Sequence, residues 1–337
     1  TGLLQRTNYV QLTDGNRNPL RDRVLITVSD EFANVLPNHD NPPSPNRERL
    51  APYMFVMDRS MNLTRWETFE RYGLDHIIAN DFAGIFVRSY SEGFGSRWRP
   101  HPGLTIEQVQ AAREKIKSLG FLYGGYNDVT DFYPLNEFFD EDRICLKPDG
   151  DLADAWPGSF SPKPDYWPTL MRSVGEKVRE HYPPDCVYLD VSTNRGPAAI
   201  DYEAGVPGAG MARSTLIGNG DSLVEARRWY GSTISEGIFR WMFAGLCDMD
   251  YAQLRMDDPM PLPLDFDLLK LHPYQHGTMM GYSPNTLLSP DELKDLHAGQ
   301  KPASVPFYKY VATSLAYGHM LLIGYGYFPP MSAIIQY

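Results

Sequence analysis

Cysteine is scarce in this sequence, and its placement excludes several kinds of site. The 337 residues include three cysteines, Cys145, Cys186 and Cys247, which lie far apart and form no CxxC motif. Because no histidine stands at ligand spacing from them, a zinc site is not expected. The odd number of cysteines also argues against a disulfide framework.

Clustered positive charge and long apolar runs are lacking as well. The chain has 31 Lys and Arg residues against 42 Asp and Glu residues, for a formal net charge of -11. No run of Lys or Arg forms a basic stripe, so a nucleic-acid partner is not expected. No uninterrupted apolar run reaches membrane-spanning length, so no membrane span is expected either.

Aromatic residues, by contrast, are abundant. They make up 13% of the chain, with 21 Tyr and 6 Trp, while the hydrophobic fraction of 42% is enough for a proper core. Flat aromatic faces suit a protein that stacks against sugar rings, although large cores also use them. The composition is therefore compatible with a carbohydrate-binding protein and equally with an aromatic-rich core.

The chain alternates between short β-rich runs that end in polar residues and amphipathic helical stretches. The predicted strands are residues 53–57, 75–79, 121–126, 186–189 and 231–235, a run around Cys247, and residues 268–271 and 319–323. Helical spacing is found in residues 106–119, after a capped start at Thr105, and in 167–182 and 222–230. This alternation predicts an α/β fold, and eight units predict a (β/α)8 TIM barrel. A doubly wound sheet is the alternative, but no Gly-rich phosphate turn follows the first strand.

Two regions are predicted along the chain. Residues 1–50 are interpreted as an N-terminal lead-in or linker segment, which could belong to an accessory β domain. Within it, residues 23–29 have a strand-like composition and residues 38–49 form a polar, Pro-rich connector. Residues 51–337 form the predicted catalytic barrel. The chain opens at Thr1 without Met, which indicates a processed or trimmed product. It ends at Tyr337, where a helix after the last strand would begin, so that helix is unusually short or C-terminal residues are missing.

Two carboxylates after neighbouring strands are the predicted catalytic pair. Asp190 follows the fourth predicted strand and Glu236 the fifth, and barrel active sites lie at the carboxyl ends of the strands. Because adjacent strands lie about 5 Å apart, the two carboxyls can reach the roughly 5–5.5 Å separation of a retaining glycosidase, or a wider one for inversion. The alternatives are an N-cap role for Asp190 and an ion pair of Glu236 with Arg240 one helical turn on.

Further polar and aromatic residues at the predicted strand ends and loops are expected to bind substrate. They are Asp58, Asp81, Asn127, Asp131, Tyr133, Trp156, Trp241, Asp248, Asp250, His272, His276 and Tyr325. Asp248 and Asp250 put two carboxylates on one face of an extended chain, which can hold a metal or bind sugar hydroxyls, or can simply be solvated. His272 and His276 could meet on a helix, but Pro273 argues for a loop and against a metal pair. For the aromatic members, core packing is the alternative to stacking.

Several segments resemble a bacterial family of large barrel glycosidases, the endo-α-N-acetylgalactosaminidases and their relatives. The matching segments are residues 131–140, the strand ending at Asp190, residues 205–210 and the segment 235–237, in an order that covers roughly residues 50–330. In that family the nucleophile is an Asp after the fourth strand and the acid/base is a Glu after the fifth. The resemblance therefore implies these roles for Asp190 and Glu236. The loop after Asp190 departs from the family's Trp/Gly-rich pattern and the β-sandwich domains upstream are absent from this sequence, so endo action on mucin-type glycans is not carried over.

The leading hypothesis is a retaining glycosidase in carbohydrate metabolism or polysaccharide degradation. Its substrate would be an oligosaccharide, polysaccharide or glycoconjugate, with no cofactor and no catalytic metal. A metal-assisted hydrolase or lyase that uses Asp248, Asp250 and His276 is the first alternative, and a non-catalytic carbohydrate-binding barrel is the second. We favour an extracytoplasmic location, secreted or periplasmic.

Overall fold

A parallel sheet forms the centre of the computed structural model. The structure describes residues 10–18, 26, 28–30, 41–58, 63–81, 95–193, 199–236, 243, 245–251, 291, 312 and 322–323. Its strands are β1 (Met54–Asp58), β2 (Ile77–Asp81), β3 (Leu122–Asn127), β4 (Cys186–Leu189), β5 (Ser232–Glu236), β6 (Met249–Tyr251) and β7 (Leu322–Ile323). They lie in the order β6-β5-β4-β3-β2-β1-β7, and each neighbouring pair is parallel.

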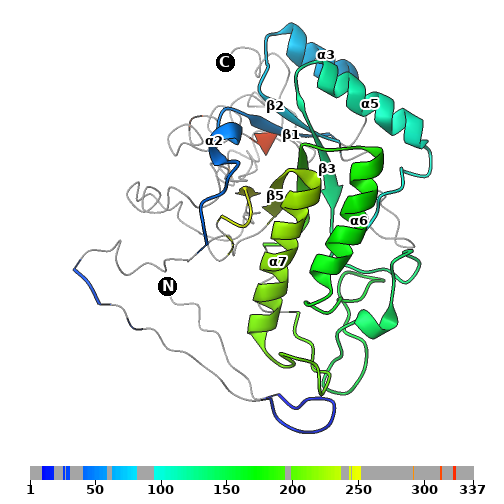
Figure 1. Cartoon of the computed structure of the whole chain (residues 1–337), viewed down its shortest axis with the longest axis vertical. Helices are drawn as coiled ribbons and strands as arrows, with labels where there is room; N and C mark the ends of the chain where they lie inside the picture. The colour runs from blue at the N-terminus through cyan, green and yellow to red at the C-terminus, as the bar shows by residue number, and fades with distance from the viewer. Residues whose placement is uncertain are drawn as a thin grey trace.

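Helices follow the strands in the chain. They are α2 (Arg47–Leu50), α3 (Leu63–Arg71), α5 (Ile106–Ser118), α6 (Trp167–His181) and α7 (Ala212–Tyr230), with a short 3-10 helix at Glu141–Arg143. Figure 1 shows α6 and α7 side by side, and α3 and α5 as a second neighbouring pair at the top of the view. None of the helices in the described parts of the chain is long and apolar enough to cross a membrane.

The two faces of the sheet carry different layers. Buried side chains of α3, α5, α6 and α7 share one hydrophobic cluster with strand residues such as Val56, Ala79 and Val187. The opposite face has a smaller cluster of its own, formed by Leu50, Phe55, Met57, Ile78, Tyr126, Cys186, Tyr188, Ile234 and Met249. A doubly wound sheet would carry helices on both faces. Here the four longer helices, α3, α5, α6 and α7, pack on one face, and of the described helices only the short α2 reaches the other, through Leu50. Together with the strand order, this indicates a curled half-barrel, consistent with an α/β barrel.

Most of the predicted elements that fall on described residues are confirmed. Seven of the eight predicted strands match β1 to β7, while residues 268–271 lie outside the described residues. The capped helix start is confirmed too, because Thr105 and Gln108 form a capping box at α5. The strand expected over residues 23–29 is wrong at Ile26 and Val28, which are not part of a strand and are 80% and 90% exposed.

Helix α7 begins ten residues earlier than its apolar pattern predicts, at Ala212. Two glycines, Gly218 and Gly220, interrupt the apolar spacing over this stretch. A side chain at Gly218 would come within 2.1 Å of the Pro164 carbonyl oxygen, so the glycine lets α7 approach the segment that leads into α6. The contact explains a residue that looks unfavourable in a helix when it is viewed alone.

Candidate active site

Asp190 and Glu236 lie at the carboxyl ends of two adjacent parallel strands. Asp190 follows the last residue of β4 directly, and Glu236 is the last residue of β5. Leu189 and Ser235, one residue earlier on each strand, are partners in the register. The Asp190 amide donates to the Asn127 carbonyl over 3.0 Å, which fixes its position beside β3 as well.

Two tyrosines hold the carboxylates from the inner face of the sheet. The Tyr126 hydroxyl donates to Oδ2 of Asp190 over 2.6 Å. The Tyr188 hydroxyl lies 2.8 Å from Oε2 of Glu236 and 3.4 Å from Oδ1 of Asp190. These two distances place Oδ1 of Asp190 and Oε2 of Glu236 no more than about 6.2 Å apart, so the two carboxylates lie at one site.

The two acids differ in their access to solvent. Asp190 is partly exposed, whereas Glu236 is 5% exposed and Tyr188 is fully buried. The tyrosine rings stack with their centroids 5.8 Å apart, so the hydroxyl oxygens are held by packed, rigid groups. This arrangement offers one acid that a substrate can reach and a second acid held in a drier environment.

The backbone is strained immediately after Asp190. Val191 has a φ of 43°, a left-handed conformation that is rare for a β-branched residue and costs about 1–3 kcal/mol. The loop is held on two sides: the Thr193 amide donates to the Ser235 hydroxyl and the Glu236 carbonyl, and Asn219 of α7 donates to the Ser192 carbonyl. Strain that the surrounding structure maintains in this way is typical of functional sites.

The Asn127 side chain, predicted to bind substrate, is buried on the helix side of the sheet. Its Oδ1 accepts from the amides of Ser96 and Asp128, and its Nδ2 donates to the Tyr230 hydroxyl on the helix side of the sheet. Asn127 is 1% exposed. Successive residues of a strand point to opposite faces, so it is the preceding residue, Tyr126, that faces the site.

Asp248, also predicted to bind substrate, lies away from the carboxylate pair. This carboxylate is fully buried just before β6, and it accepts from Ser44 (2.5 Å), Arg227 (2.8 Å) and the Thr233 amide (2.8 Å). Thr233 lies three residues before Glu236 on β5, about 10 Å along the strand. Asp248 therefore belongs to the opposite end of the sheet, where it fixes the segment that precedes α2.

Two further predicted contacts lie in the core. Tyr133 is 1% exposed, which supports the alternative of core packing over stacking on a sugar, and Asp131 is 6% exposed. Trp156 is 52% exposed in the connection between β3 and α6, so a stacking role there stays a prediction.

For three of the remaining predicted residues the structure gives the position in the sheet, and the other four lie outside the described residues. Asp58 and Asp81 end β1 and β2 and are partners in the register, and Asp250 pairs with Ser235. Outside the described residues lie Trp241, His272, His276 and Tyr325. Within the described residues, no group of three or more His, Cys, Asp or Glu side chains could hold a metal ion.

Sequence reasoning missed the two tyrosines. A signal for one of them was present, because Tyr188 stands two residues before Asp190 on the same strand and therefore on the same face. Tyr126 pairs with Tyr188 in the register of β3 and β4, which only the assembled sheet reveals.

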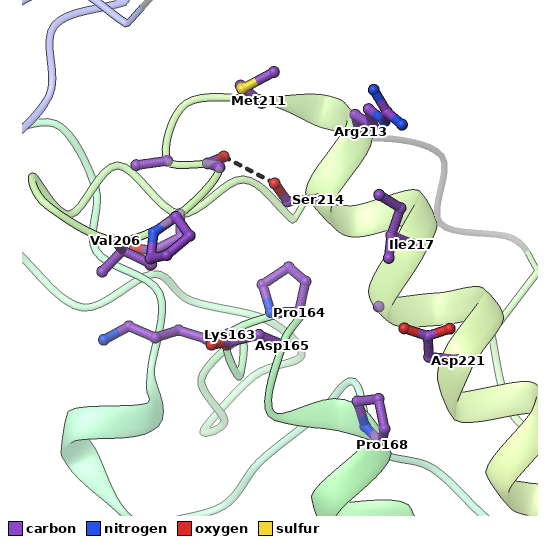
Figure 2. A pocket seen from close by; sticks show the side chains of 15 residues that line it. Lys163, Pro164, Asp165, Pro168, Val206, Met211, Arg213, Ser214, Ile217 and Asp221 are labelled. Atoms are coloured by element: carbon purple, nitrogen blue, oxygen red, sulfur yellow. Dashed lines mark hydrogen bonds between the residues drawn. The ribbon is translucent and has the colours of Figure 1, made fainter.

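A separate cavity of about 430 Å³ lies between the segment leading into α6 and the start of α7. In Figure 2, Pro164 and Pro168 face Ile217 and Asp221 across it. Buried Asp201 also lines this cavity, and desolvation raises the pKa of its carboxyl above the usual value. Neither of the predicted catalytic acids lines it.

Comparisons with known proteins give matches among solved structures. No protein-family model and no curated protein matches the chain. The ligand-free alpha-N-acetylgalactosaminidase NagBb from Bifidobacterium bifidum matches with a TM-score of 0.55 and 15% identity, over 70% of this chain and 44% of that one. A doubly substituted GH36 alpha-galactosidase AgaA from Geobacillus stearothermophilus, in complex with stachyose, matches with a TM-score of 0.57 and 10% identity, over 84% of this chain and 40% of that one.

These matches bear on the fold. The chain spans less than half the length of either solved chain, and the identities are 15% and 10%. Both neighbours are glycosidases by name, and the likeness supports the barrel architecture that the strand order indicates.

Proposed function

We propose that this protein is a retaining glycoside hydrolase in which Asp190 is the nucleophile and Glu236 the general acid and base. The observation that carries the proposal is the pair of carboxylates at adjacent strand ends, both in contact with the Tyr188 hydroxyl. The names of the structural neighbours favour an α-linked galactose or N-acetylgalactosamine as the sugar.

The reaction follows from the difference between the two acids. The partly exposed Asp190 carboxylate attacks the anomeric carbon, and the bond to the leaving oxygen breaks as Glu236 gives that oxygen its proton. Glu236 then removes a proton from water, which attacks the anomeric carbon and releases Asp190 as a carboxylate. Two displacements at one carbon return the original configuration.

The proposal is tested with Asp190→Ala and Glu236→Ala on two kinds of glycoside. Loss of the nucleophile should abolish turnover for every leaving group. Loss of the acid should spare aryl glycosides with activated leaving groups, while natural glycosides are cleaved about 10²–10⁴-fold more slowly. Azide should then rescue Glu236→Ala and yield a glycosyl azide of retained configuration.

Other outcomes would point to the alternatives. Equal losses in both variants on all substrates, with no azide product, would remove the role assignment. Activity that a chelator abolishes would favour the metal-assisted reaction, for which Asp248, Asp250 and His276 are the proposed ligands. Sugar binding without turnover in the wild-type chain would favour a non-catalytic barrel.

A further inference from the structure

One phenol contacts both members of the carboxylate pair. The Tyr188 oxygen lies 2.8 Å from Oε2 of Glu236 and 3.4 Å from Oδ1 of Asp190. A phenol carries a single proton, so it donates to one carboxylate at a time. Tyr126, in contrast, is placed to donate to Asp190 alone within this pair, at 2.6 Å from its Oδ2.

The Tyr188 oxygen is held in place while its proton can turn. The ring is fully buried on β4 and stacks on Tyr126 with an interplanar angle of 23°. Rotation about the bond between the ring and the oxygen reorients the hydroxyl hydrogen without moving either heavy atom. The acceptor that Tyr188 serves is therefore decided by where the negative charge lies, because charged acceptors form the stronger hydrogen bonds.

The charge moves between the two acids during the reaction of the proposed function, on which this inference rests. Forming the glycosyl bond takes the charge from Asp190 and leaves it on Glu236, and hydrolysis reverses the transfer. A donor fixed on Glu236 would favour the first step and oppose the second. A donor fixed on Asp190 would do the opposite, because it stabilises the starting carboxylate of the first step and the released carboxylate of the second.

We propose that Tyr188 is a positioning residue that turns its hydroxyl proton between Asp190 and Glu236 and stabilises whichever carboxylate gains charge in each step. The phenol stays protonated throughout, so no covalent bond to it forms or breaks. Tyr126 acts as the fixed donor to Asp190. The two tyrosines therefore have different kinetic signatures although they are neighbours on one face.

The experiment compares Tyr188→Phe with Tyr126→Phe, each of which removes one oxygen and keeps the ring. For a glycoside with an activated aryl leaving group, kcat/KM reports formation of the glycosyl-enzyme and kcat reports its hydrolysis. Tyr188→Phe should change kcat/KM and kcat by the same factor to within about threefold, because the turning proton serves the charged carboxylate both before and after each step. Tyr126→Phe should lower kcat and raise kcat/KM, by about 10-fold or more in opposite directions, because its fixed hydrogen bond stabilises the carboxylate that the first step consumes and the second step releases.

The pH profile gives a second readout that a merely structural role would not move. Without the Tyr188 donor, ionised Glu236 is less stable, so the basic limb of kcat/KM should move to higher pH in Tyr188→Phe and stay in place in Tyr126→Phe. Near-UV circular dichroism and the urea midpoint of each variant check that the fold is intact.

A measurement that needs no turnover separates this inference from the proposed function. Carbon-13 NMR of labelled Asp and Glu carboxyls at one neutral pH should show that Tyr188→Phe changes the carboxyl chemical shifts of both acids, while Tyr126→Phe changes that of Asp190 alone. If the wild-type chain cleaves no glycoside, the proposed function fails but the NMR comparison still decides the sharing of the proton. A Tyr188→Phe variant that changes one carboxyl resonance only, or changes kcat and kcat/KM by clearly different factors, would overturn the inference.

Discussion

At the end of β3, two neighbouring residues serve opposite faces of the sheet. Tyr126 reaches Asp190, while Asn127 bonds to Tyr230 and the Ser96 amide on the helix side. Burial raises the pKa of the Tyr230 hydroxyl, which keeps it neutral in this contact. Polarity alone therefore does not identify a residue of the candidate site, because polar Asn127 faces away from the carboxylate pair while its neighbour Tyr126 contacts it.

Asp248 is likewise a polar residue that lies away from the candidate site, and its buried contacts lead to a stability prediction. Asp248→Ala removes a fully buried carboxylate that accepts from Arg227, Ser44 and Thr233. Breaking one partner out of a buried ion pair costs about 3–5 kcal/mol. We expect a loss of that size in the free energy of urea unfolding.

The exposed carboxylate of Asp221 on α7 provides the control. Asp221→Ala should change the free energy of unfolding by no more than about 0.5 kcal/mol. If Asp248→Ala instead kept its stability and lost sugar binding, Asp248 would belong to the substrate site after all.

At the scale of elements, the loop before α7 is closed by a tight contact between a glycine and a serine. The Ser214 hydroxyl donates to the Gly208 carbonyl over 2.9 Å, as Figure 2 shows. A Cβ added at Gly208 would come within 2.0 Å of that hydroxyl oxygen, and Gly208 has a φ of 81°. Gly205 has a similar φ of 85° but nothing within 4 Å of its added Cβ.

This pair of glycines gives a matched prediction. Gly205→Ala should lower the free energy of unfolding by about 1–2 kcal/mol, the cost of a left-handed non-glycine residue. Gly208→Ala should cost more, because overlap with Ser214 adds to the same strain. Combining Gly208→Ala with Ser214→Ala should recover that excess, as measured by urea unfolding in a double-mutant cycle. Equal costs at the two glycines would show that the loop shifts freely and that the contact does not constrain it.

At the scale of the whole molecule, two buried carboxyls respond to pH in opposite directions. Desolvation raises the pKa of Asp201 above 3.8, whereas the hydrogen bond from Arg172 lowers the pKa of Glu225 below 4.5. Asp201 is 6% exposed and the Glu225 side chain 12% exposed, so both effects belong to the folded state. The protein as a whole carries a net charge of -11.

The free energies of unfolding of Asp201→Asn and Glu225→Gln, relative to the wild type, should therefore change with pH in different ways. The unfolded state ionises Asp201 first, so the wild type loses stability as pH rises from about 3.8 through the higher folded pKa, and Asp201→Asn should gain relative to it over that window. Glu225 contributes stability above about pH 4.5 that is lost as pH falls through its lower folded pKa, so Glu225→Gln should lose relative to the wild type at neutral pH. Urea unfolding at a series of pH values measures both. Parallel curves for the two variants would contradict the assigned directions.

Local pattern was enough to predict the order of the elements. The period-2 runs and the capping box at Thr105 are read from neighbouring residues, because strand and helix periods are properties of the chain itself. The pattern failed at Gly218, where a residue that weakens an isolated helix is required by the close approach of Pro164, a contact across 54 positions of the chain.

The sequence alone is enough to place Asp190 and Glu236 at the carboxyl ends of consecutive strands, and parallel pairing then brings them to one end of the sheet. Which polar residues join them depends on the tertiary structure. Pleat phase and register turn Tyr126 and Tyr188 toward the pair and Asn127 away from it. A shift of one residue in a strand reverses the face of every side chain, so the composition of the site depends on pairing between segments that are distant in the sequence.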